Sequence, residues 1–243
     1  MVARQTLDLL VGVQILPGEN GLKTFLLRLL NMITGLVFYA LGIVMMINAD
    51  IGYAPWEVFH VGLANTIGLT IGVTSIIAGI VIVLIVTILG EKLGLGTIAS
   101  MILTGVFIDI FFFFDFIPMA KSLLTGVIML IAGLFILAIG SYFYIKSGFG
   151  VGPRDNLMVV LARRTKFPVG VCRSAVELLV TVIGWLLGGK VGIGTVISVI
   201  SIGFCVEITF RLLRFDVTQI KHETLKDTFD SLLGKGKSNL ESN

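Results

Sequence analysis

The chain has 243 residues, of which 56% are hydrophobic and only 14% are charged, and its formal net charge is +3. Soluble domains carry about a quarter charged residues, so the composition excludes an ordinary soluble protein and predicts an integral membrane protein. No basic face with interleaved aromatic residues supports nucleic-acid binding. Cys172 and Cys205 have no neighbouring histidines with which to form a metal site, so we expect two free, buried thiols and no cofactor.

Residues 1–27 precede the first long apolar stretch and are predicted to form a cytoplasmic segment without a cleavable signal. Six stretches with few or no charges follow, each long enough to cross about 30 Å of hydrocarbon, which takes about 20 helical residues. They are Leu29–Ala49, Ile67–Gly90, Leu93–Phe114, Ser122–Ile145, Phe167–Gly189 and Val191–Phe210. The lipid bilayer is therefore the first predicted partner.

Two shorter helices are predicted between these spans, each after a loop that contains glycine. They begin at Pro55 and Pro153, and proline suits the first turn because its missing N–H has no helical partner there. About twelve residues at 1.5 Å each reach only about 18 Å, which is too short to cross. We favour a re-entrant half-helix that dips to the middle of the membrane, while a helix lying at the interface or a tilted span stays open.

The sequence repeats itself after 98 residues. Pro55 aligns with Pro153, and Asp109 aligns with Glu207. The pattern predicts one membrane repeat at residues 28–118 and a second at 119–214. Each repeat has three spans, an odd number, so the two repeats must insert in opposite orientations, which is a usual way to build a two-fold arrangement around a central pathway.

The distribution of basic residues predicts that both termini are cytoplasmic, because cytoplasmic loops of membrane proteins collect Lys and Arg. With that topology the basic residues near the cytoplasmic ends are Lys23, Arg28, Lys146, Arg163, Arg164, Lys166, Arg211 and Arg214. Residues 215–243 are predicted to be a polar cytoplasmic tail. The predicted fold is an all-α membrane protein of about six transmembrane helices, built as two inverted three-span repeats, each with a short half-helix.

Four elements of the chain resemble the YczE/YyaS/YitT family of bacterial integral membrane proteins. They are Gly52–Leu63 with its Gly-x-x-Pro-Trp-Glu pattern, Gly68–Gly72, Gly94–Thr97 and the span that ends near Asp109. The resemblance covers roughly residues 25–213. It implies a multi-pass protein of the bacterial plasma membrane, and it brings no agreed substrate or catalytic residues with it.

Charged residues inside the spans are the first candidates for a site, because such charges are costly and usually face a bundle interior or water. Arg173 and Glu177 lie one turn apart in the fifth span, where the first repeat has Ser75 and Gly79. The pair either binds substrate or only neutralises itself and locks helix packing. Arg173 could also extend to the cytoplasmic interface.

The starts of the two half-helices are the second candidates, with Trp56 and Glu57 in one and Arg154 and Asp155 in the other. Helix N-termini present N–H groups and partial positive charge, which suits an anionic group, and Trp56 could stack on a substrate. In the alternative, Glu57 and Asp155 only cap their helices. His60, one turn after Trp56, is either part of the site or an ordinary hydrogen-bonded residue.

Asp109 and Glu207 are the third candidates and occupy matching positions late in their spans. They either lie near head groups or a helix end, or flank the pathway and couple a proton or an ion. No phosphate-binding loop, no His-Glu-x-x-His motif and no Ser/His pair supports an enzyme.

The leading hypothesis is a small-solute transporter or permease with a central site between the repeats. Its unknown solute would contact Trp56, Glu57, His60, Arg154, Asp155, Arg173 and Glu177. The alternative is a non-transporting scaffold or regulatory partner of another complex. A homodimer is compatible with either hypothesis.

Overall fold

The computed structural model describes residues 21–91 and 93–215, and over these ranges all of its regular secondary structure is helical. Residues 1–20 of the predicted segment 1–27 and residues 216–243 of the predicted tail 215–243 lie outside the described residues. The helices are α2 (Gly21–Asn48), α3 (Pro55–Ile67), α4 (Ile71–Ile88), α5 (Leu95–Phe113), α6 (Leu123–Lys146), α7 (Pro153–Thr165), α8 (Val169–Leu186) and α9 (Ile193–Leu212).

Six of these helices, all except α3 and α7, are long and apolar enough to cross a membrane. The predicted all-helical membrane fold with six spans is therefore confirmed. The predicted second span was drawn too long at its start, because Gly68 ends α3 in a left-handed conformation with φ of 69°. The Thr70 side chain then accepts a hydrogen bond from the Val73 N–H and begins α4.

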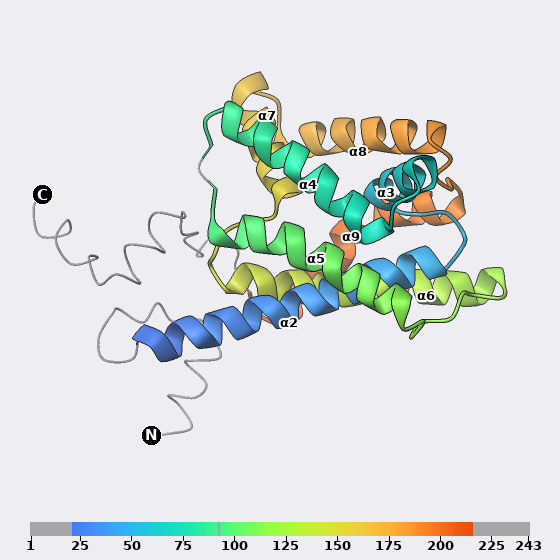
Figure 1. The fold of residues 1–243 in the computed structure, drawn as a ribbon, viewed down its shortest axis with the longest axis horizontal. Coiled ribbons are helices and arrows are strands. Elements are labelled where there is room, and N and C mark those ends of the chain that lie inside the picture. The colour runs from blue at the N-terminus through green and yellow to red at the C-terminus, as the bar shows by residue number, and fades with distance from the viewer. Residues whose placement is uncertain (1–20, 92, 216–243) are drawn as a thin grey trace, which may run out of the picture.

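The short helix α3 starts inside the molecule, α7 starts partly buried, and both end at the surface. In α3 the residues from Pro55 to Val58 are buried, whereas Ile67 at its end is exposed. In α7 the middle is buried and the end at Thr165 is exposed. Figure 1 shows α3 near the beginning of α4 and α7 near the end of α4. Neither helix is among the six of spanning length, and whether they are re-entrant or lie at the interface stays a prediction.

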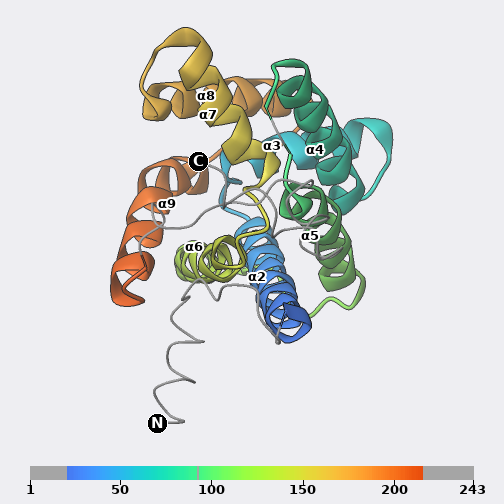
Figure 2. The ribbon, with the colours of Figure 1, turned by 90° about the vertical axis from the view of Figure 1, so that its left-hand side faces the viewer.

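Helices α2 and α6 form the closest pair in the bundle and run side by side (Figure 2). Their contact is made by glycine, because small residues let membrane helices approach closely. A Cβ atom on Gly35 would lie 2.8 Å from the Gly140 carbonyl oxygen, and one on Gly42 would lie 2.7 Å from the Gly133 carbonyl oxygen. These four glycines therefore bring the backbones of α2 and α6 into contact.

The helix boundaries recur at the 98-residue offset found in the sequence: α3 and α7 have the same length, and so do α4 and α8. Packing follows the same rule, since α3 packs on α8 as α7 packs on α4, and α2 packs on α5 as α6 packs on α9. Each half-helix thus packs against a long helix that belongs to the other half of the chain. The opposite orientation of the halves in a membrane stays a prediction.

The loop before each half-helix is also held by the other half. The Gly194 N–H donates to the Ile51 carbonyl oxygen, and at the matching positions the Gly96 N–H donates to the Phe149 carbonyl oxygen, both at 2.8 Å. Gly52 has a φ of 110°, a conformation that favours glycine. These bonds fix the point from which each half-helix starts.

Candidate functional site

A pocket lies between the two halves, and the starts of both half-helices form part of its wall. Pro55 and Pro153, the first residues of α3 and α7, both line it, and the long helices of both halves complete the wall. The space between its walls is about 1080 Å³, part of it open to the outside. The pocket therefore lies where the two-fold arrangement predicted from the sequence would place a central site.

The structure brings together all seven side chains that were predicted to contact a solute. Trp56, Glu57, His60, Arg154, Asp155, Arg173 and Glu177 all line the pocket. They come from α3, α7 and α8, and most of the ionisable ones belong to the second half of the chain. Their roles in binding stay predictions, but their proximity is a property of the fold.

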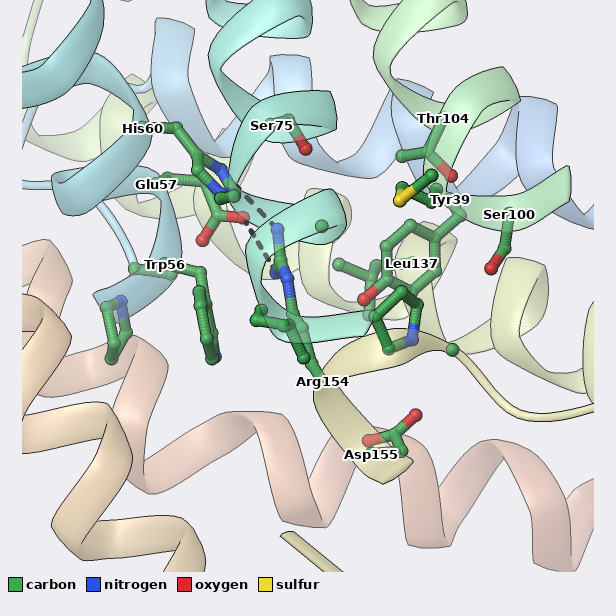
Figure 3. Close-up of a pocket in the computed structure, with 18 of the residues that line it drawn as sticks. Tyr39, Trp56, Glu57, His60, Ser75, Ser100, Thr104, Leu137, Arg154 and Asp155 are labelled. Carbon is green, nitrogen blue, oxygen red and sulfur yellow. Dashed lines mark hydrogen bonds and ion pairs between the residues drawn. The ribbon is translucent and has the colours of Figure 1, made fainter. Parts of the chain in front are cut away.

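Arg154 is the centre of the first polar cluster and extends from α7 across to α3 (Figure 3). Its Nη1 lies 3.5 Å from Glu57 Oε1, and its Nη2 lies 3.4 Å from His60 Nδ1. Its guanidinium carbon lies 4.8 Å from the centre of the Trp56 ring, a cation–π contact. Glu57 and His60 are only 3% and 1% exposed, so Arg154 neutralises a carboxylate that is almost fully removed from solvent.

The neighbouring residue Asp155 has a different environment. Asp155 is exposed, and among the described residues no hydrogen bond or ion pair reaches its carboxylate. It lines the pocket on the other side of α7 from Arg154. The start of α7 is held by Tyr144 instead, whose hydroxyl oxygen accepts a hydrogen bond from the Gly152 N–H. Asp155 is thus open to a ligand in the pocket.

Arg173 and Glu177 form the second polar cluster, on α8. Arg173 Nε donates to Glu177 Oε1 at 2.8 Å, and the Glu177 side chain is 13% exposed against 47% for Arg173. The pair is therefore formed within one helix, as the self-neutralising alternative requires, and it also lines the pocket.

Ser198 of α9 is a pocket residue that sequence reasoning missed. The residue is 1% exposed, and its Oγ is the one buried side-chain nitrogen or oxygen without a hydrogen-bond partner in the described part of the chain. Its counterpart Ser100, 98 residues earlier, donates to the Thr97 carbonyl oxygen at 3.1 Å. The signal was available, because a serine recurs at this position in both repeats. An unpaired buried hydroxyl beside a pocket suits a ligand contact.

Asp109 and Glu207 do not line the pocket. Asp109 accepts hydrogen bonds from the Thr70 hydroxyl at 2.6 Å and from the Gly72 N–H at 2.8 Å, so it bonds the N-terminal start of α4, as the helix-end alternative predicted. Glu207 pairs with Arg211 on its own helix at 2.7 Å, and its side chain is 62% exposed. The matching positions thus make different bonds.

The described residues contain no group of three or more His, Cys, Asp or Glu side chains that could hold a metal ion. Both cysteines are buried and free, as predicted. The chemistry available in the pocket is therefore that of charged and hydroxyl side chains and of two helix N-termini.

Comparison with known proteins identifies the relatives of this chain. A family model described as a family of unknown function, DUF6198, matches residues 26–211. The chain is 35% identical to the uncharacterized membrane protein YczE of Bacillus subtilis over 188 residues, which cover 76% of this chain and 83% of that protein. It is 30% identical to an uncharacterized protein of Haemophilus influenzae, with 83% and 94% covered.

A further relative is the uncharacterized protein YyaS of Bacillus subtilis, which is 30% identical over 68% of this chain and 83% of its own length. No solved structure matches the chain significantly. The resemblance to YczE and YyaS that the sequence elements predicted is confirmed.

Proposed function

This chain belongs to the DUF6198 family, and we propose that it is a small-solute transporter or permease of the bacterial plasma membrane, with both termini in the cytoplasm. The solute binds in the central pocket, between the starts of α3 and α7. The cytoplasmic position of the termini follows from the distribution of Lys and Arg.

The observation that carries this proposal is the convergence of charged groups and two half-helix starts on one pocket within a bundle of six apolar spans. Charges at membrane depth are costly unless they are paired or face water, and they commonly mark substrate pathways. Discontinuous helices whose N-termini face each other near the middle of a bundle are a frequent way to build such a site. A scaffold protein has no need of either feature.

The charges in the pocket suit a solute that is neutral overall and carries groups of both signs. Three carboxylates and two guanidinium groups line it, a formal charge of −1: Glu57, Asp155, Glu177, Arg154 and Arg173. Each helix N-terminus adds about half a positive charge, so the two half-helices roughly offset this excess. A zwitterion can place its cationic group against Asp155 and its anionic group against the N–H groups of a half-helix start.

The test is uptake of radiolabelled zwitterionic solutes into proteoliposomes, after a thermal-shift panel has identified a ligand, since a ligand that binds only the native state raises apparent stability. We expect Arg173→Ala and Glu177→Gln to lose both the thermal shift and the uptake. Arg211→Ala is the matched control, because it removes an Arg–Glu pair of the same spacing that lies outside the pocket.

Uptake at the wild-type rate in Arg173→Ala and Glu177→Gln would remove these two residues from the mechanism. A flat panel with well-folded protein, together with a partner that co-purifies, would favour the non-transporting alternative.

A further inference from the structure

Helices α8 and α9 do not pack along each other, although the matching helices α4 and α5 do. We call the line along which each pair of helices meets its seam, so the α4–α5 seam is closed and the α8–α9 seam is open. Helix α4 packs along α5, whereas α8 and α9 diverge, as Figure 2 shows on opposite sides of the bundle. In the closed seam, a Cβ on Gly72 would collide with the Gly105 carbonyl oxygen, and a Cβ on Gly105 would lie 2.6 Å from the Gly72 carbonyl oxygen. The two helices are in backbone contact there.

The open seam has the same glycines but no contact between them. Gly170 and Gly203 stand 98 residues after Gly72 and Gly105, and nothing lies within 4 Å of a Cβ built on either one. The carboxylates at matching positions also differ. Asp109 of α5 accepts a hydrogen bond from the Gly72 N–H of α4, whereas Glu207 of α9 pairs with Arg211 of its own helix and does not bond α8. The second half therefore has the glycines that a close contact between α8 and α9 would need, but these two helices lie apart.

A groove runs along this opening. In its wall Glu177, Thr181 and Thr195 are buried or half-buried, whereas Ser174, Leu178, Val196 and Val199 are exposed. Glu177 and Pro55 line both the groove and the central pocket, so the two spaces meet there. Val196 and Val199 are 60% and 49% exposed on an apolar helix of spanning length.

The groove thus connects a charged pocket with the surface that faces hydrocarbon. A purely apolar chain does not match the Glu177 end of this space, because it would remove the charged Arg173–Glu177 pair from water without offering a new hydrogen bond. A fully polar solute does not match the outer end at Val196 and Val199. Only a molecule with a polar head and an apolar chain matches both ends.

We propose that the α8–α9 groove is a lateral portal, and that the substrate is a single-chain amphiphile with a head group that is neutral overall. The head lies in the central pocket, where the unpaired Ser198 hydroxyl and Asp155 can bond it. The chain passes between α8 and α9 into the lipid. This inference rests on the proposed function and narrows its substrate class.

The test compares two neighbouring residues of α9. Val199 lines the groove, whereas Ile200 is 60% exposed and lines neither space, so Val199→Trp fills the portal and Ile200→Trp is the matched control. Native mass spectrometry in mild detergent measures binding of lauroyl lysophosphatidylethanolamine, and glycerophosphoethanolamine serves as the head group alone. We expect Val199→Trp to weaken lysolipid binding by about tenfold or more and Ile200→Trp to leave it unchanged.

The head-group probe keeps the inference separate from the proposed function. Glycerophosphoethanolamine should bind Val199→Trp as it binds the wild type, and Arg173→Ala should lose both probes. Equal lysolipid binding by the two tryptophan variants would overturn the portal, because the lipid would then only coat the surface. So would a change from dimer to monomer confined to Val199→Trp, which would assign the opening to a second copy of this chain. Transport of water-soluble zwitterions without lysolipid binding would overturn the portal and leave the proposed function intact.

Discussion

Arg154 connects the two halves of the site through its side chain alone. It extends from α7 to Glu57 and His60 on α3 and covers the Trp56 ring. Glu57 is 3% exposed, so its carboxylate depends on this partner. Removing one member of a buried ion pair is strongly destabilising because the other charge is left without compensation.

We therefore predict that Arg154→Met lowers the free energy of unfolding by about 3–5 kcal/mol, the usual cost of breaking a buried pair. Adding Glu57→Gln should restore much of the melting temperature, because the uncompensated charge is then gone. Solute binding should stay lost in the double variant. Thermal melts and ligand binding measured on both variants separate the two effects. Full binding by a stable double variant would contradict a role for Arg154 in the site.

Ser198 allows a test in which function and stability move in opposite directions. Its hydroxyl has no hydrogen-bond partner, so Ser198→Ala should leave the stability of the protein unchanged or slightly raised. The same variant should weaken solute binding by about tenfold, or about 1.4 kcal/mol. Ser100→Ala should instead lose about 1 kcal/mol of stability, since Ser100 donates to Thr97. Thermal shift with and without solute measures both. An unchanged affinity in Ser198→Ala would leave its hydroxyl without a role.

Sequence reasoning identified the charged residues of the pocket because charges inside apolar spans are conspicuous. Arg173 and Glu177 stand out for that reason, and Arg154 stands out beside a helix-starting proline. Ser198 does not stand out, because a serine costs little in a membrane helix and commonly bonds its own backbone. Its unpaired state depends on how α9 is placed against its neighbours, which composition does not specify.

At the scale of helices, lengths were predictable and seams were not. The hydrophobic stretches predicted six spans, and Pro55 and Pro153 predicted where the half-helices start. Gly72 of α4 aligns with Gly170 of α8 in the sequence, yet of these two only Gly72 is in contact with a neighbouring helix. The same residues are compatible with both arrangements, so the choice is made by packing across the whole bundle.

The unequal seams predict unequal effects of the same substitution. Gly72→Ala adds a methyl group against the backbone of α5 and should lower the melting temperature, with a cost in the range of about 1–3 kcal/mol for overpacking. Gly170→Ala meets open space and should be neutral or stabilising by up to about 1 kcal/mol, because alanine favours helix more than glycine does. Melting temperatures of the two variants check this. A large loss of stability in Gly170→Ala would mean that the α8–α9 seam spends much of its time closed.

At the scale of the whole molecule, the two halves complete each other. The loop before α3 bonds the turn before α9 and the start of α9, the loop before α7 bonds the start of α5, and α2 packs on α6 through glycines. The pocket takes Trp56 and Glu57 from one half and Arg154, Arg173 and Glu177 from the other. In each half, the half-helix is buried only in part by long helices of the same half, and a long helix of the other half completes its packing.

A split protein tests this interdependence. The chain can be divided in the loop between α5 and α6, which bridges the repeats, and the two fragments produced together or separately. We expect the fragments to co-purify when produced together and to recover solute binding, because each supplies contacts that the other lacks. Each fragment alone should show no cooperative melting. A split inside the α3–α4 connection is the control, since it separates a half-helix from its own repeat. Cooperative melting of one half on its own would show instead that each repeat folds independently and that the pocket forms only afterwards.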